Sequence, residues 1–567
     1  MTLSTFSFYR GRRCGTPLRL AIAAAASLAL VGLAQAQTVP PNAGDVLRDL
    51  PAPKPALPAL SDQPASAGEA APAAAVGQRF TFNRLVVEGL SRLQPFQVQL
   101  LADPFVNKPM GEAELAALLQ SLRQRLDRAG LTLAMIGLPR LDTAAGVVTV
   151  PVVEPKLGRV TVPVNADAPV TEARVRGLLS WFNLREGETL DVAALERVLF
   201  ALNDMPGVQA KAKLTPSGDE GLYNVSIQLA PRRSWDASVL VDNQGLSTVG
   251  RMRVAANGRL NNPLGLGDNL DALAMVTNSA GVKAGRLAYE LPVVYTPMRL
   301  SLAASDLHYE LGGDFKTWGA TGRARILEAG LAYPLIRARG RTLLARLGVD
   351  DKHFTDQLDE YPDLNGDRRV RTLVASLNWE SRDTFGGGGF WGAGFTQRMG
   401  KLSYAMTPTS NQPEAGRFGK RELQLNRLQT LSGPVSMYLA ISQQSASRNL
   451  DPAEKLGLGG ARGVRAYAVA EAPSDDATIV NAELRWWLNR HWTVYLLSDW
   501  ARGHLDHDAA GVEGNTVTRR GSGVGVNATY PDWVTVRATL AWRQSGRSIA
   551  DPGHDKPRLA VQAVHSF

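Results

Sequence analysis

The feature that most constrains this chain is an alternation of apolar and polar residues that runs from Arg232 to Phe567. Successive side chains of a strand point to opposite faces, so a period of two predicts strands with one apolar and one polar face. At about 20 residues per strand and connection, the block holds roughly 16 strands. The clearest strand alternates Val534, Val536, Ala538, Leu540 and Trp542 with Thr535, Arg537, Thr539 and Arg543.

Such strands suit either a soluble sandwich or a membrane barrel, and the start of the chain favours the barrel. An apolar core, 20–33, follows basic residues and ends in Ala34-Gln35-Ala36, which is typical of a signal peptide over 1–36. No apolar run long enough for a membrane helix follows it. Phe567 ends the last strand on an aromatic residue, as in many bacterial outer-membrane proteins, and is the expected barrel-assembly signal. We therefore predict a membrane all-β fold, an antiparallel transmembrane β-barrel of about 16 strands over 232–567, closed because lipid tolerates no open sheet edge.

Two repeated modules precede the barrel. Residues 80–155 and 156–231 align at an interval of 77, at which Leu122, Gly130 and Pro139 match Leu199, Gly207 and Pro216. Each is predicted to be an α+β unit of strand, helix, helix, strand and strand, with expected strands at 80–88, 131–139, 147–154, 157–163 and 223–230.

A linker rich in proline and alanine, 37–79, joins the signal peptide to the first module and should be extended. One island within it, 43–50, is predicted to form a short helix with the apolar residues Val46, Leu47 and Leu50. A helix of this length is marginal in water, so it needs a host surface.

Composition and spacing favour neither catalysis nor a bound cofactor. Basic and acidic residues are interspersed despite the net charge of +9, which argues against nucleic acid as a partner. The one cysteine, Cys14, lies in the leader, so the mature chain has no thiol ligand for a metal. Two weaker metal signals stay open: residues 363–367 have part of a calcium-loop spacing, and 504–508 could bind zinc, although a polar loop suits them better. We expect no cofactor, no metal and no enzymatic activity.

The stretch 457–467 carries a specific resemblance. After Gly463 it contains Val464-Arg465-Ala466-Tyr467, which resembles the VRGY signature on the sixth extracellular loop of Omp85-superfamily transporters. Alanine at the third place is a familiar variant in the hemolysin-activator branch, the ShlB/FhaC/HecB family. Two modules before the barrel, instead of five, point to the same branch, and the modules then resemble POTRA domains. The resemblance covers the whole mature chain.

The resemblance also implies a partner for the loop arginine. The family carries an inward-facing aspartate on a later strand, and Leu497-Ser498-Asp499 matches that motif. The alternation agrees, because Val494, Leu496 and Trp500 would face lipid and Asp499 the interior. A salt bridge between Arg465 and Asp499 is therefore implied, the alternative being a solvated Arg465. Where the family often has Ser-Gly-Asp, this chain has Ser474-Asp475-Asp476.

The function that the resemblance implies is that of a TpsB transporter of two-partner (type V) secretion. The chain would lie in the outer membrane of a Gram-negative bacterium with the modules in the periplasm, surrounded by outer-membrane lipid and inserted by the barrel-assembly machinery. It would export, and in some cases activate, a hemolysin- or adhesin-like exoprotein (TpsA-like), and the helix of Val46, Leu47 and Leu50 would plug the lumen at rest. Two alternatives remain: an Omp85-type assembly factor for other barrels, and a passive porin that would leave the modules without a role.

Overall fold

The computed structural model describes residues 42–48 and 79–567, except 92, 164–166, 219–220, 280, 407–413, 470, 510–511, 532 and 552–556. The predicted signal peptide, most of the linker and Leu50 lie outside the described residues. The island in the linker forms α1 (Ala43–Arg48). Among the described residues, no helix combines the length and apolar character needed to span a bilayer.

The first module packs two helices on a small mixed sheet. Its longer helix, α3, buries a stripe of leucines that includes Leu118 and Leu122, and the chain turns away after it at Gly130, whose φ is 81°. The sheet has the order β2-β6-β4, with β2 parallel to β6, and β1 pairs with β3. The elements are β1 (Phe80–Phe82), β2 (Arg84–Glu88), α2 (Pro95–Ala102), η1 (Asp103–Phe105), β3 (Lys108–Met110), α3 (Glu112–Arg128), β4 (Met135–Ile136), β5 (Arg140–Asp142) and β6 (Val147–Val153).

The strand predicted over 131–139 is wrong for most of its length. Strand structure there is limited to the two residues of β4, because Leu131 and Ala134 turn back into the core beneath α3. Pro139 on this segment and Pro151 on β6 have no N–H, so a continuous antiparallel ladder cannot form between them. The pairing resumes in β5, opposite Val147 to Thr149.

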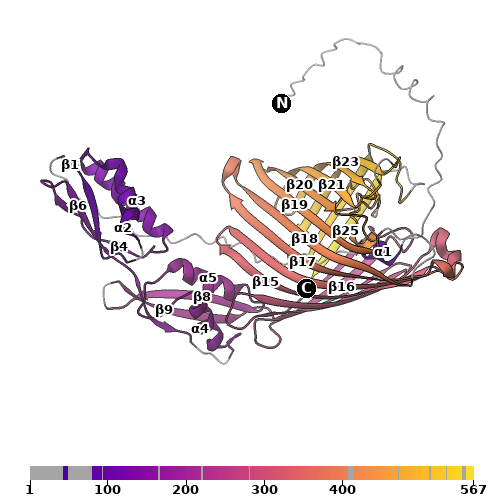
Figure 1. Ribbon diagram of the computed structural model, residues 1–567, viewed down its shortest axis with the longest axis horizontal. Helices are drawn as coiled ribbons and strands as arrows, with labels where there is room; N and C mark the ends of the chain where they lie inside the picture. The colour runs from indigo at the N-terminus through magenta and orange to yellow at the C-terminus, as the bar shows by residue number, and fades with distance from the viewer. Residues whose placement is uncertain are drawn as a thin grey trace, which may run out of the picture. The chain divides into compact units, whose positions relative to one another are not determined.

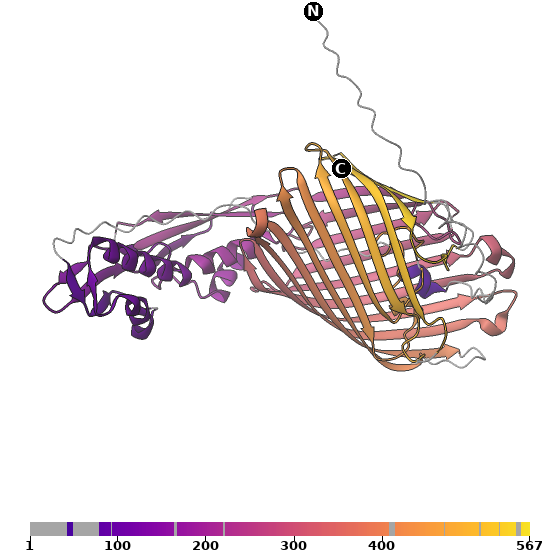
Figure 2. The ribbon, with the colours of Figure 1, turned by 90° about the horizontal axis from the view of Figure 1, so that it is seen from above.

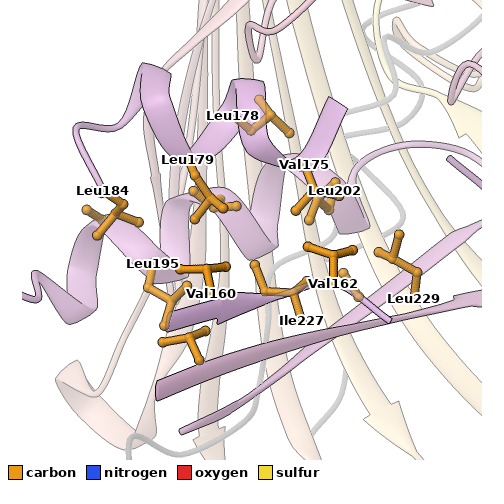
Figure 3. Close-up of a cluster of buried hydrophobic side chains, with 14 of the residues drawn as sticks. Val160, Val162, Val175, Leu178, Leu179, Leu184, Leu195, Leu202, Ile227 and Leu229 are labelled. Atoms are coloured by element: carbon orange, nitrogen blue, oxygen red, sulfur yellow. The ribbon is translucent and has the colours of Figure 1, made fainter. Parts of the chain in front are cut away.

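The second module repeats the plan with a complete third strand. Its elements are β7 (Lys156–Thr161), α4 (Glu172–Trp181), α5 (Val192–Asn203), β8 (Val208–Pro216) and β9 (Leu222–Pro231), in the sheet order β7-β9-β8. The side chain of Asp191 caps α5 by accepting from the Ala194 N–H at 2.9 Å. Figure 3 shows the core, in which Leu178 and Leu202 from the helices meet Val160 and Ile227 from the sheet.

The remainder of the chain forms one closed antiparallel barrel, in which sixteen strands are described, as predicted (Figure 1). The first and last strands close it, with Val239 opposite His565 and Val241 opposite Ala563. The strands are β10 (Trp235–Asp242), β11 (Arg253–Asn261), β12 (Asn269–Thr277), β13 (Val282–Pro292), β14 (Arg299–Glu310), β15 (Thr321–Ala338), β16 (Arg341–Gln357), β17 (Gly366–Asp383), β18 (Gly389–Met406), β19 (Gly416–Ser432), β20 (Val435–Ala446), β21 (Asp476–Trp487), β22 (Trp492–His504), β23 (Thr516–Tyr530), β24 (Val534–Arg543) and β25 (Arg558–Ser566). Four 3₁₀ turns lie between strands: η2 (Gly313–Trp318), η3 (Pro362–Leu364), η4 (Phe385–Gly387) and η5 (Pro452–Glu454).

The alternation read from the sequence separates the two faces of the barrel wall. Leu327 and Leu496 are 63% and 59% exposed on the outer face, whereas Tyr495, Leu497 and Asp499 are buried on the inner face. Connections at one end are as short as 339–340 and 433–434. At the other end they are longer, and three of them carry the site: loop 6 (447–475), loop 7 (505–515) and loop 8 (544–557).

Candidate functional site in the barrel lumen

Loop 6 folds into a narrow hairpin whose tip is the predicted motif. Its two arms exchange backbone hydrogen bonds, Leu456 with Ser474 at 2.8 and 2.9 Å and Leu458 with Glu471 at 2.8 Å. Gly463 has to be a glycine, because a Cβ there would lie 2.4 Å from the Leu458 carbonyl oxygen. The four side chains of the tip, Val464, Arg465, Ala466 and Tyr467, are buried. The apolar ones pack on inner-face residues of the wall such as Ile479, Ala501, Val517 and Ala541.

The structure places Arg465 and Asp499 in direct contact. The Nε and Nη2 atoms of Arg465 donate to the two carboxylate oxygens of Asp499 at 2.9 and 2.7 Å, and the Arg465 backbone N–H adds a bond of 3.0 Å. The Nη1 atom donates to Glu483 on β21. Asp499 also accepts from Asn481 at 2.8 Å, and the same amide donates to the Gly463 carbonyl at 2.8 Å. This forked pairing is geometry that a lysine cannot reproduce.

Glu483 is a residue of this site that the sequence analysis missed. Its carboxylate is buried and accepts from Arg485 at 2.7 Å and Arg537 at 2.9 Å in addition to Arg465. The inward direction of Glu483 could have been predicted from the sequence, because its neighbours Ala482 and Leu484 face outward and successive strand residues alternate between faces. Arg485 lies two residues away on the same strand, but Arg465 and Arg537 could not be read from that pattern, because they come from loop 6 and from β24, on the far side of β22 and β23.

Tyr467 and Glu471 attach the hairpin to loop 8. The Tyr467 ring lies between the guanidinium groups of Arg519 and Arg543, at 5.2 and 5.4 Å, and its hydroxyl donates to the Ser545 carbonyl. Glu471 is fully buried and accepts from Arg519 at 2.8 Å. It also accepts from the Ser548 hydroxyl at 2.5 Å and from the backbone N–H groups of the next two residues. No pattern in the sequence indicates the contacts of Glu471.

The base of loop 6 is joined to loop 7 through Asp475. The buried Asp475 carboxylate accepts from the backbone N–H groups of Leu450, at 3.2 Å, and His507, at 3.0 Å. Lys455 approaches it at 3.3 Å and donates to Asp506 at 2.6 Å. Burial raises the pKa of Asp475 to about 6, against the opposing effect of Lys455. The predicted polar loop at 504–508 therefore contacts loop 6, and a metal-binding group of His, Cys, Asp and Glu is not found among the described residues.

The helix α1 lies inside the barrel against β14, β15, β16 and the η5 turn of loop 6 (Figure 2). The N–H of Ala43 donates to Asp356 at 2.7 Å, and the Asn42 amide oxygen accepts from Arg368 at 2.9 Å. Ala43 and Val46 are buried among inner-face side chains of the wall, and Leu47 is half-buried there. Val46 and Leu47 of the predicted helix thus lie against the inner wall of the barrel.

One arginine connects α1, the wall and loop 6. Arg368 on β17 is buried and pairs with Asp356 on β16 and, at 2.6 Å, with Asp451 of loop 6. Beside it, the fully buried Glu454 of η5 pairs with Lys352 at 2.5 Å and Lys420 at 3.0 Å. These wall residues escaped the sequence analysis, because inward polar residues occur on every strand and nothing local distinguishes those that meet a loop.

At the end of the chain, Phe567 lies one residue beyond β25, and its N–H donates to the Ala237 carbonyl at 3.0 Å. The side chain is half exposed, on the same face as Leu559. Phe567 therefore lies at the seam between the first and last strands of the barrel.

The chain is similar to a known family over most of its barrel. A family model described as haemolysin secretion/activation protein ShlB/FhaC/HecB matches residues 221–528, and one for the POTRA domain, ShlB-type, matches residues 80–155. The heme/hemopexin transporter protein HuxB of Haemophilus influenzae is 28% identical over 300 residues, 52% of each protein, so the chain spans about half the length of that curated relative. The outer membrane transporter CdiB of Escherichia coli is 25% identical over 500 residues, 82% of each.

Solved structures show the same fold. CdiB from Escherichia coli has a TM-score of 0.69 at 20% identity, covering 92% of this chain and 95% of that one. CdiB from Acinetobacter baumannii has a TM-score of 0.65 at 14% identity, covering 87% and 91%. At these identities the likeness establishes only the architecture, modules followed by a barrel. The function has to be inferred from the contacts that loop 6 and α1 make in the lumen.

Proposed function

Because the chain belongs to the ShlB/FhaC/HecB family of haemolysin secretion/activation proteins, we propose that it is the outer-membrane translocator of a two-partner secretion system. It exports a separate large exoprotein through its barrel, with the two modules in the periplasm. The observation that carries this proposal is loop 6, which enters the lumen and binds the wall through Arg465, Asp499 and Glu483. A passive pore has no use for such an anchored loop together with two modules.

The modules are proposed to receive the cargo as an extended segment. Within the described residues β8 pairs with β9 alone, so its outer edge presents backbone groups to which a cargo strand can add. The leucines of the helices, such as Leu118 and Leu195, are buried in the module cores and contribute structure before binding. Main-chain pairing accepts many sequences, which suits a large and repetitive exoprotein.

The lumen is proposed to be closed at rest by α1 and opened by its departure. The helix is short and tethered by the proline-rich linker, so it can leave without unfolding a module. Transport needs no nucleotide, because folding of the cargo outside the cell drives it.

Phe567, at the seam of the barrel, is proposed as the signal read by the barrel-assembly machinery.

Deletion of the gene in its own bacterium tests the proposal. One large exoprotein should disappear from the medium and return with the full-length chain, while the profile of outer-membrane proteins stays unchanged. A chain that lacks residues 80–155 should still insert its barrel and fail to secrete. General loss of outer-membrane proteins would instead identify an assembly factor, and an unchanged medium would identify a passive pore.

A further inference from the structure

The outer face of β15 to β19 carries basic residues near the loops, where a lipid-facing surface is expected to be apolar. The side chains of Arg325 and Arg371 are 58% and 65% exposed. They lie on the same strand faces as the outward Leu327 and Leu373. Charge on the lipid face of a barrel is strongly destabilising at the bilayer midplane and tolerated near the interface, which places these residues at the headgroups. Six exposed residues form this basic cluster: Arg323, Arg325, Arg369, Arg371, Lys401 and Arg417.

Strand register brings the basic cluster together. Arg371 lies directly opposite Lys401, and Lys401 opposite Arg417, across three neighbouring strands. On the other side, His353 lies between Arg325 and Arg369. Directly opposed residues have Cβ atoms about 4.5–5.5 Å apart, so the six side chains form one surface.

Interleaved carboxylates orient the guanidinium groups without neutralising them. Arg323 makes a forked pair with Asp306, in which Nε donates to Oδ1 at 3.0 Å and Nη2 donates to Oδ2, and Asp351 accepts from both Arg369 and, at 3.3 Å, Arg371. The third nearby acid, Asp367, bonds His353 at 2.8 Å. Six cations beside these three carboxylates and the exposed Glu310 of β14 leave the surface positive, and the planar fork of a guanidinium matches the oxygens of a phosphate.

An apolar hollow adjoins the basic cluster on the outer wall. It has a volume of about 820 Å³ and is lined by Leu287, Leu327, Val349 and Leu373, with Asp351 and Arg371. Asp351 and Arg371 each lie two residues nearer to the loop between β16 and β17 than Val349 and Leu373, so the hollow continues from the charges toward the middle of the wall. A lipid with a phosphate group above an acyl chain would match this surface, with the phosphate at the basic cluster and the acyl chain in the hollow.

The corresponding outer face of β20 to β25 is different. Among the described residues of those strands, the exposed arginines near the loops on this face are Arg502 and Arg520, and Trp500 lies between them on the paired strands. A general need for charge at the headgroups would distribute arginines evenly around the barrel. The concentration on β15 to β19 indicates a specific binding surface.

We propose that the basic cluster binds the phosphate groups of a glycolipid of the outer leaflet, with an acyl chain in the hollow beneath. This inference depends on the outer-membrane location of the barrel and not on secretion. The lipid holds β15 to β19, the part of the wall whose inner face supports α1 and η5.

The test measures binding of fluorescent diphosphorylated lipid A to the purified full-length protein in detergent. Arg325→Gln, Arg371→Gln and Lys401→Gln together remove half of the cations of the basic cluster, so they should weaken binding at least about tenfold. The matched control is Arg502→Gln with Arg520→Gln, which should leave binding within about twofold of the unmodified protein. Heat-modifiable migration on gels verifies that both variants retain a folded barrel.

Three further probes identify what is recognised. Dephosphorylated lipid A should bind at least about tenfold more weakly than the diphosphorylated form, and phosphatidylglycerol and inorganic pyrophosphate should both compete poorly. Equal binding by the triple variant or by dephosphorylated lipid A would overturn the proposal. Competition by phosphatidylglycerol at equal concentration would show that the surface binds anionic lipids in general. Competition by pyrophosphate would show that the lipid is not recognised. Either result would also overturn the proposal.

Discussion

Loop 6 and helix α1 occupy the same lumen but are attached to the wall in different ways. Arg465 alone makes four hydrogen bonds to two buried carboxylates, and Tyr467 and Glu471 add contacts to loop 8. Among the described side chains of the helix region, its contacts include the Ala43 N–H bond to Asp356, the Asn42 amide with Arg368, the buried Ala43 and Val46, and the half-buried Leu47. Removing one partner of a buried ion pair costs about 3–5 kcal/mol, whereas ordering each residue of a docked helix itself costs about 1–2 kcal/mol.

The ion pairs of Arg368, beside α1, do not depend on the helix. Arg368 pairs with Asp356 of the wall and Asp451 of loop 6, so it keeps both counterions when α1 departs. Loop 6, by contrast, cannot leave without separating Arg465 from both of its carboxylates. The lumen therefore combines a fixed element, loop 6, with a removable one, α1.

The largest effect is expected from Arg465→Ala. Asp499 and Glu483 would lose their shared cation inside the wall, which should release the tip of loop 6 at a cost of about 3–5 kcal/mol and abolish secretion. Exported cargo and protease cleavage within loop 6 measure the result in cells that carry a folded barrel. The matched control is Arg462→Ala, an exposed arginine of the same loop, which should behave as the unmodified protein. Normal secretion by Arg465→Ala would remove loop 6 from the mechanism.

A smaller loss is expected from Glu471→Gln, which keeps the shape of the side chain and removes its charge. The amide keeps one acceptor oxygen and cannot serve both Arg519 and the loop 8 donors Ser548, Ile549 and Ala550, so loop 8 should loosen by about 1–3 kcal/mol. Hydrogen exchange of residues 544–551 should become faster, while Arg465 stays bound. Glu513→Gln, at an exposed position of loop 7, is the control. Unchanged exchange would show that loop 8 is held by Tyr467 instead.

The residues of the lumen also differ in how far their contacts could be predicted from the sequence. Alternation gives the face of every strand residue, which placed Asp499 inside, and the motif gave the tip of loop 6. The partners of Glu471 depend on the path of loop 8, and the partners of Glu483 depend on register across four strands, neither of which is a local property. The wrong strand at 131–139 has a related cause, since two prolines on neighbouring segments interrupt a ladder that each segment alone would permit.

Helix α1 should be displaced from the lumen by one added side chain, because fewer contacts hold it than hold loop 6. Gly44 faces η5 so closely that a Cβ there would lie 2.7 Å from the Ala453 backbone nitrogen. Gly44→Val should therefore exclude the helix and raise single-channel conductance in planar bilayers toward that of a chain lacking residues 40–75. Leu47→Ala, at a half-buried position, should retain most of the closed state. Conductance unchanged by both Gly44→Val and the deletion would show that α1 does not close the pore.

The smallest effect concerns the joint between loops 6 and 7. Burial raises the pKa of Asp475 to about 6, so the folded loop prefers the protonated carboxyl, and this preference strengthens the joint as the pH falls through 6. The hydrogen bond with Asp476 raises the pKa of His507, whose contribution is present below its ordinary pKa and is lost as the pH rises through the raised value. Both groups act in the same direction, because each favours the protonated form in the folded loop.

Hydrogen exchange of residues 447–455 and 505–509, corrected for the intrinsic effect of pH, should therefore show better protection at pH 5.5 than at pH 8. Asp475→Asn cannot lose a proton and still offers an oxygen to the Leu450 and His507 N–H groups, so it should remove most of this difference. His507→Gln should remove the remainder, since it keeps the backbone donor and loses the titrating ring. Protection that rises with pH would mean that Lys455 and the ionised Asp475 hold the joint, and loop 6 would then be fixed by charge at its base as it is at its tip.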